Sequence, residues 1–98
     1  MDKEKIKEIA DYYGRKEQLH QLMEECSELS VESSHSIRGR GSKADLAGEM
    51  ADVIIMIFQC LYLEDIPEED LKTLIQFKLD RQLRRIKDEQ FRQRVKEN

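Results

Sequence analysis

The residues that break helices stand at only a few places in this chain, and they constrain its fold more than any other feature. Four glycines and one proline occur in 98 residues, whereas the good helix formers Leu, Glu, Lys, Gln, Arg, Met and Ala dominate outside one short loop. Gly14 interrupts the first helical pattern, residues 37–43 (IRGRGSK) form the loop, and Pro67 stands at a helix start. The sequence therefore predicts an all-α fold.

Four helices follow from the apolar spacing between these breaks. The first two cover residues 3–13 and 15–36, the third runs over about 44–63, and the fourth starts at Pro67 and continues beyond residue 89 as an exposed, fraying helix or a tail. We expect an antiparallel helical bundle in one domain, 1–98. The stripe predicted to be buried in the second helix contains Leu19, Leu22, Met23, Cys26, Leu29 and Ser30.

The third predicted helix contains the run VIIMIFQCLYL, which is apolar nearly all round. Such a helix has to be covered on every side, and a chain of 98 residues has too few other helices to do so. We therefore expect this helix to pack in the core of a homo-oligomer, against a second subunit. Ser42 and Asp45 are both candidates for its N-cap.

The cysteines, the apolar runs and the net charge indicate where the protein is located and which classes of partner it binds. Cys26 and Cys60 both fall in apolar helical patterns, which favours buried free thiols over a disulfide. Residues 1–18 are mostly charged or polar and carry no signal-peptide pattern, so a cytoplasmic location is expected. The longest apolar run, 50–63, is short for a membrane span, which takes about 20 residues. The net charge of −4 argues against a general nucleic-acid binder.

Two acidic pairs at i, i+3 spacing flank the loop: Glu25 with Glu28, and Glu49 with Asp52. Each pair projects from one helix face, where like charges cost roughly 0.2 to 0.5 kcal/mol per pair. No Lys or Arg lies within four residues of any of the four acids. If the two helices are antiparallel, the pairs face one another and make an oxygen-only site. Such a site suits Mg²⁺ or Mn²⁺ rather than Zn²⁺.

Further polar residues extend this candidate site. Gln18 and Gln21 share one edge of the second helix with the acids and are expected at the rim of the core. Lys78, Arg81 and Arg85 follow one another at i, i+3 and i+7 on the fourth helix. These are the cations that a polyphosphate substrate needs.

The two acidic motifs and their surroundings resemble a known family. The pattern EExxE, then 20 residues, then ExxD is present, together with the stretches GRKEQLHQLMEECSEL, EMADVIIMIFQ and FKLDRQLRRI. Over about residues 14–86 the chain is similar to the small single-domain, MazG-like, all-α nucleoside triphosphate pyrophosphohydrolases of bacteria and phages.

The resemblance implies an Mg²⁺-dependent hydrolase that cleaves a (d)NTP to the (d)NMP and pyrophosphate in nucleotide-pool house-cleaning. It also implies a dimer or tetramer with the site near a subunit boundary. Lys78 and Arg81 would offset the charge of the leaving pyrophosphate. The implied metal ligands are Glu25, Glu28, Glu49 and Asp52, and the implied catalytic set adds Glu24 as the acid that orders the attacking water. The nucleobase, the phosphorus attacked and the number of metals stay open.

The same residues allow other interpretations. Glu32, Asp45 and the basic face of the fourth helix also suit simple solvated surfaces, and Arg38, Arg40 and Lys43 suit a mobile loop better than a phosphate cradle. A non-enzymatic alternative is a helical interaction module, or a protein that binds nucleotide without turnover. The base pocket has the candidates Tyr12, Tyr13, Gln18, Gln21 and His20.

A di-iron site is excluded by distance. The two ExxH motifs, Glu17 to His20 and Glu32 to His35, stand on one helix about 22 Å apart by helical rise. One chain cannot bring both to the same metals, so His20 and His35 are expected to be exposed or at the rim.

Overall fold

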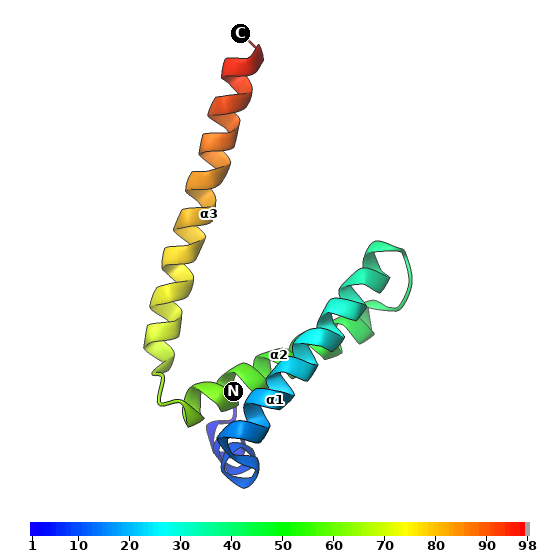
Figure 1. Ribbon diagram of the computed structural model, residues 1–98, viewed down its shortest axis with the longest axis vertical. Coiled ribbons are helices and arrows are strands. Elements are labelled where there is room, and N and C mark those ends of the chain that lie inside the picture. The colour runs from blue at the N-terminus through cyan, green and yellow to red at the C-terminus, as the bar shows by residue number, and fades with distance from the viewer. Residues whose placement is uncertain (98) are drawn as a thin grey trace. The chain divides into compact units, whose positions relative to one another are not determined.

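The structure, a computed structural model, describes residues 1–97, which contain three helices and no strand (Figure 1). Helix α1 spans Lys3–Ile37, α2 spans Lys43–Leu63, and α3 spans Glu68–Glu97. The all-α prediction is confirmed. The chain divides into two compact units, Met1–Ile66 and Pro67–Asn98, and each is described by itself. The single domain and the four-helix bundle stay predictions.

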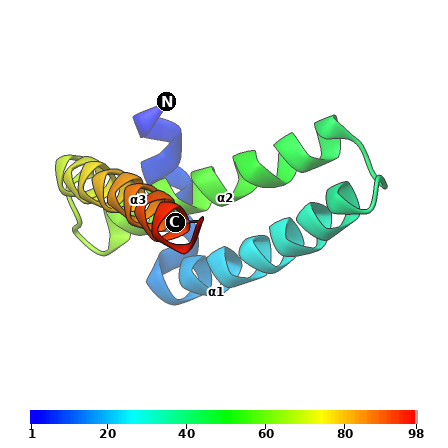
Figure 2. The ribbon, with the colours of Figure 1, turned by 90° about the horizontal axis from the view of Figure 1, so that it is seen from above.

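Gly14 bends α1 and separates the two helical stretches that the sequence predicts there. Its backbone has φ 83° and ψ 171°, a region that only glycine enters readily. The stretch before Gly14, dark blue in Figures 1 and 2, runs in a different direction from the remainder of α1. The first two predicted helices are therefore one bent helix, whose N-cap Asp2 accepts a hydrogen bond from the amide of Lys5 at 3.2 Å.

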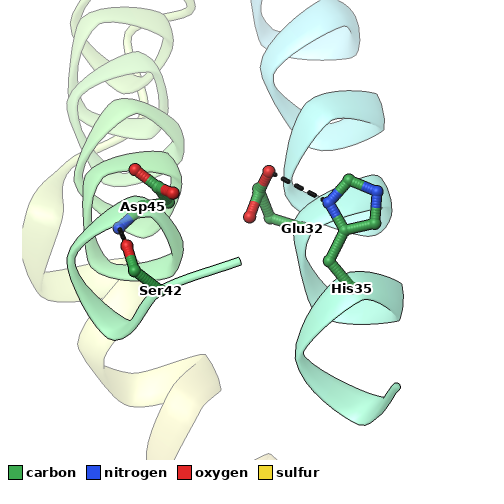
Figure 3. Close-up of polar contacts among 4 residues, drawn as sticks. All are labelled: Glu32, His35, Ser42 and Asp45. Carbon is green, nitrogen blue, oxygen red and sulfur yellow. Dashed lines mark hydrogen bonds and ion pairs between the residues drawn. The ribbon is translucent and has the colours of Figure 1, made fainter. Parts of the chain in front are cut away.

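The long stretch of α1 and helix α2 form an antiparallel hairpin, as predicted, and the connection at residues 38–42 lies within the predicted loop 37–43 (Figures 1 and 2). Ser42 is the N-cap of α2, because its Oγ accepts a hydrogen bond from the amide of Asp45 at 3.0 Å (Figure 3). At the other end the chain turns at Asp65, with φ 54°, and the amide of Ile66 donates to the carbonyl of Leu61 at 2.9 Å.

The hairpin buries few side chains, and two of them are glutamines. Gln18 is 4% exposed and Gln59 is 2% exposed. Polar side chains at such positions are uncommon unless they have a partner, since burying an amide without a hydrogen bond costs about 1 to 3 kcal/mol. The buried apolar side chains are Ala10, Met56, Cys60 and Leu61.

Polar contacts tie the bent N-terminal stretch to the end of α2. The hydroxyl of Tyr62 donates to Asp11 Oδ2 at 3.1 Å, and this hydrogen bond, with lesser contributions from burial and nearby carboxylates, raises the pKa of Tyr62. Arg15, one residue after the bend, makes an ion pair with Glu64. The hydrogen bond holds the stretch before Gly14 against α2, and the ion pair holds the residue just after the bend.

The predicted buried stripe of α1 is partly wrong. Met23 is 66% exposed, and Cys26 and Ser30 are also exposed, whereas Leu19, Leu22 and Leu29 are half-buried. The reason is that α2 covers only one side of α1 in the hairpin, and that side is centred on the line through Gln18 and Glu25. Both thiols are free, as expected, but Cys60 alone is buried.

Helix α3 begins directly after Pro67 with three acids, Glu68 to Asp70, at the favourable end of its dipole. It remains helical to Glu97, so of the two alternatives predicted beyond residue 89, an exposed helix or a tail, the structure has the helix. None of its described side chains is buried. Its exposed large apolar side chains are Leu74, Ile75, Phe77, Leu79, Leu83, Ile86, Phe91 and Val95.

Helix α2 is long and apolar enough, by length and composition alone, to cross a membrane, with a mean hydropathy of 1.6. Core helices of soluble proteins meet the same criterion, and Glu49 and Asp52 lie within this helix. The property therefore gives only weak support for a membrane span.

Candidate metal centre and adjoining pocket

Three carboxylates from the two hairpin helices meet at one point. Glu25 of α1 and Glu49 and Asp52 of α2 each place one oxygen within 4.8 Å of the other two. Glu25 and Glu49 are half-buried, and Asp52 is exposed. The antiparallel hairpin thus brings the two predicted acidic pairs together.

The surroundings of Glu49 disfavour its charged form. Loss of solvent raises the pKa of Glu49 most, and the nearby charges of Glu28, Asp52 and Glu25 raise it further. Glu28 is itself exposed and lies beside Glu49 rather than among the three closest oxygens. A bound cation would reverse the balance, because positive charge favours the ionised carboxylates.

Two oxygens of the cluster are buried without a hydrogen-bond partner: Glu25 Oε2 and Glu49 Oε2. In the part of the chain that the structure describes, the ion pairs do not involve Glu25, Glu49 or Asp52. The other oxygen of Glu25 accepts a hydrogen bond from Gln21 Nε2 at 2.8 Å, which fixes the orientation of this carboxylate. The possible ligands are all carboxylate oxygens, and two of them have no hydrogen-bond donor. Such a set of ligands fits Mg²⁺ or Mn²⁺.

An open pocket of about 380 Å³ adjoins the cluster, with Glu25 and Asp52 in its wall. This volume lies in the range of small-molecule sites. The wall away from the acids carries the buried amides Gln18 and Gln59, and its remaining lining residues are Ile9, Tyr13, Glu17, Gln21, Ile55 and Met56. Ile9 and Tyr13 precede the bend at Gly14, so the bend supplies one side of this pocket.

A second hollow of about 270 Å³ lies on the loop side of the cluster, lined by Ser27, Glu28, Val31, Glu32 and Glu49. Figure 3 shows the Glu32 carboxylate pointing from α1 toward α2, with Oε1 3.3 Å from His35 Nδ1. Its Oε2 is buried and has no hydrogen-bond partner. Glu32 is therefore half-buried and is not a fully solvated surface acid.

The other predicted site residues lie apart from the cluster. Glu24 is exposed, and neither hollow includes it. His20 is exposed, and His35 is half-buried beside Glu32. The loop cations are exposed as well: Arg38, Arg40 and Lys43.

The predicted phosphate clamp belongs to a different unit of the chain. Lys78, Arg81 and Arg85 all lie on α3, within the unit that begins at Pro67. The carboxylate cluster and its adjoining pocket lie wholly within the unit Met1–Ile66. The role of the three cations stays a prediction.

Gln59 is a buried polar residue of the pocket that the sequence analysis did not assign to the site. It stands within VIIMIFQCLYL, seven residues after Asp52, so two helical turns place both on the same face of α2. The sequence does indicate this residue: Gln59 is the one amide in an apolar run, and it lies seven residues after the predicted ligand Asp52. Gln18 was predicted for the site at the core rim, but the structure buries it.

Comparison of the chain with protein-family models, with curated proteins and with solved structures finds no match.

Proposed function

We propose that this protein is an Mg²⁺-dependent nucleoside triphosphate pyrophosphohydrolase, which cleaves a (d)NTP to the (d)NMP and pyrophosphate in nucleotide-pool house-cleaning. The observation that carries the proposal is the cluster of Glu25, Glu49 and Asp52 beside an open pocket. A structural ion needs no adjoining pocket, whereas a hydrolase needs room for its substrate next to the metal.

The acids of the cluster would hold the cation, and their roles follow from their surroundings. Gln21 orients Glu25, and Glu28 adds negative charge beside Glu49. Mg²⁺ bound there would supply the positive charge that a triphosphate requires. Mn²⁺, with similar ligand preferences, is the expected substitute.

A pyrophosphate-release assay with each common NTP and dNTP, with and without Mg²⁺, tests the proposal. Chromatography should show the monophosphate, because cleavage to the diphosphate would release inorganic phosphate instead. Glu49→Gln and Asp52→Asn should lose more than the roughly 10- to 100-fold that removal of an outer-shell partner costs. Glu8→Gln, an exposed acid on α1 outside both hollows, is the matched control.

We also propose that the protein is a homo-oligomer, a dimer or a tetramer. The support is the number of large apolar side chains that the described chain leaves exposed, among them Met50 and Ile54 on α2 and Leu83 on α3. Contiguous exposed apolar surface is typical of protein interfaces. Light scattering coupled to size exclusion measures the mass directly, and a monomer at micromolar concentration would contradict this proposal.

The same exposed surface favours the second candidate function, a helical module that binds a partner or a nucleotide without turnover. The two candidates differ in one measurement. A module would be stabilised by nucleotide or partner but would release no pyrophosphate from any nucleotide tested.

A further inference from the structure

The hairpin has a register that places two glutamines opposite one another. On α1, Gln18 precedes Glu25 by seven residues, and on α2, Gln59 follows Asp52 by seven. Glu25 and Asp52 lie side by side across the hairpin. Because the helices are antiparallel, seven residues toward the N-terminus of α1 and seven toward the C-terminus of α2 run in the same direction, so Gln18 and Gln59 also lie side by side. The thiol of Cys60, next to Gln59, donates to the backbone carbonyl of Gln18 at 3.6 Å, which supports this alignment.

Seven residues of helix rise about 10 Å. The amides therefore lie about 10 Å along the hairpin from the carboxylate cluster, at the other end of the same pocket. This is the scale of separation between the base and the phosphates of an extended nucleotide. One ligand would reach both ends only if it carried a charged group and, at a distance, an uncharged polar group.

Gln18 needs a hydrogen-bond donor. Its side chain is 4% exposed, and its Oε1 has no partner in the described structure. Three of the nearby lining residues are apolar or aromatic: Ile55 is 40% exposed, Tyr13 is 56% exposed, and Met56 is buried. The lining also includes Glu17, which precedes Gln18 in the chain and adds a carboxylate. A flat ring with an N–H on its edge suits such walls, and carboxamides pair with base edges through one donor and one acceptor.

We infer that this amide end of the pocket binds the nucleobase, with Gln18 and Gln59 reading its hydrogen-bonding edge. The inference rests on the proposed function and deepens it, since it makes the enzyme base-selective rather than a general polyphosphate hydrolase. Gln18 Oε1 accepts from an N–H of the base, and Gln59 contacts the same edge. Both are binding residues and take no part in the reaction.

The kinetic test separates base recognition from phosphate recognition. Gln18→Met and Gln59→Met keep side-chain length and remove the amide, and Gln90→Met on α3, an exposed position, is the control. KM for the preferred NTP should rise about 10-fold in each pocket variant, the effect of one lost hydrogen bond. The Ki of tripolyphosphate, which has no base, should stay unchanged in all three variants.

A binding test gives a readout independent of activity. Side-chain amide signals of Gln18 and Gln59 are assigned by their loss in the two variants, and nitrogen-15 spectra are recorded during titration with uridine, thymidine, cytidine, adenosine, inosine and guanosine. At least one nucleoside should shift both signals and leave that of Gln90 in place. Methylation of the edge N–H of that nucleoside should abolish the shift.

The possible results are distinct. If no nucleoside moves the Gln18 and Gln59 signals, or if the variants change the Ki of tripolyphosphate as much as KM for the NTP, the inference is wrong. If the wild type releases no pyrophosphate yet a nucleoside shifts both signals, base binding stands and the hydrolase proposal fails. Loss of folding in one variant leaves the other variant and the titration to decide.

Discussion

The thiol of Cys60 on α2 donates a hydrogen bond to the backbone carbonyl oxygen of Gln18 on α1, with 3.6 Å between Sγ and the oxygen. Burial, and secondarily the charge of Glu64, raises the pKa of Cys60, so the thiol keeps its proton. This contact shows which residues of α1 and α2 lie opposite one another in the hairpin. The same register places Glu25 beside Asp52, and this pair lies two helical turns nearer the loop than Gln18 and Cys60 do.

Mg²⁺ should raise the thermal stability of the protein through Glu25, Glu49 and Asp52. A ligand that binds only the folded state adds about 2.7 kcal/mol at 100 times its Kd. Calorimetric scans over an Mg²⁺ titration measure this gain. Glu49→Gln and Asp52→Asn should lose most of it, and Glu8→Gln should retain it. Because Glu24 lies outside the cluster, Glu24→Gln should also retain it; loss there would place Glu24 among the ligands.

The raised pKa of Glu49 makes the metal-free protein more stable in mild acid than at neutral pH. Its pKa in the folded state is raised above the ordinary 4.5, so the folded protein holds this proton more tightly than the unfolded chain. The contribution of Glu49 to stability is fully present below about pH 4.5 and is lost as the pH rises through its folded pKa. In metal-free buffer the dependence of Tm on pH in that window should be shallower in Glu49→Gln than in the wild type. Equal slopes would contradict this account.

The affinity for Mg²⁺ should change in the opposite direction over the same window. The cation requires ionised carboxylates, and Glu49 must release its proton for the cation to bind. Calorimetric titrations in buffers of different ionisation enthalpy should show proton release on Mg²⁺ binding. The release should shrink as the pH rises above the folded pKa of Glu49; a release that does not change with pH would contradict this account.

Gly14→Ala should destabilise the protein by about 1 to 3 kcal/mol, because alanine is strained at φ 83° and ψ 171°. A methyl group there meets no atom within 4 Å, so the cost comes from the backbone alone. Urea unfolding of the variant measures it. If the chain instead straightens, Ile9 and Tyr13 leave the pocket, and KM rises without loss of Mg²⁺ stabilisation.

Leu61→Ala should cost about 2 to 4 kcal/mol, since Leu61 is 8% exposed in a small core. Val31→Ala, at a position 54% exposed, should change the free energy of unfolding by less than about 0.5 kcal/mol. Urea unfolding of both variants, analysed with a common slope, checks the contrast. Equal losses would mean that Val31 is covered in solution, as in an oligomer interface.

Local chemistry was readable from the sequence because it depends on neighbours in the chain. Gly14 and the loop at 37–43 marked breaks, Ser42 was one of two caps proposed, and the structure contains these features. The acidic pairs were visible because like charges at i, i+3 repel one another and no Lys or Arg nearby in the sequence offsets them. Helix type and the candidate ligands needed no tertiary information.

The tertiary structure decided which side chains share a level and which side of each helix is covered. Cys26 and Met23 fit an apolar stripe, yet they are exposed because α2 contacts the side of α1 that carries Gln18 and Glu25. Gln59 became part of the pocket only through the hairpin register. A sequence determines the face of a helix on which a residue lies, but packing between helices determines which face is buried and what it meets.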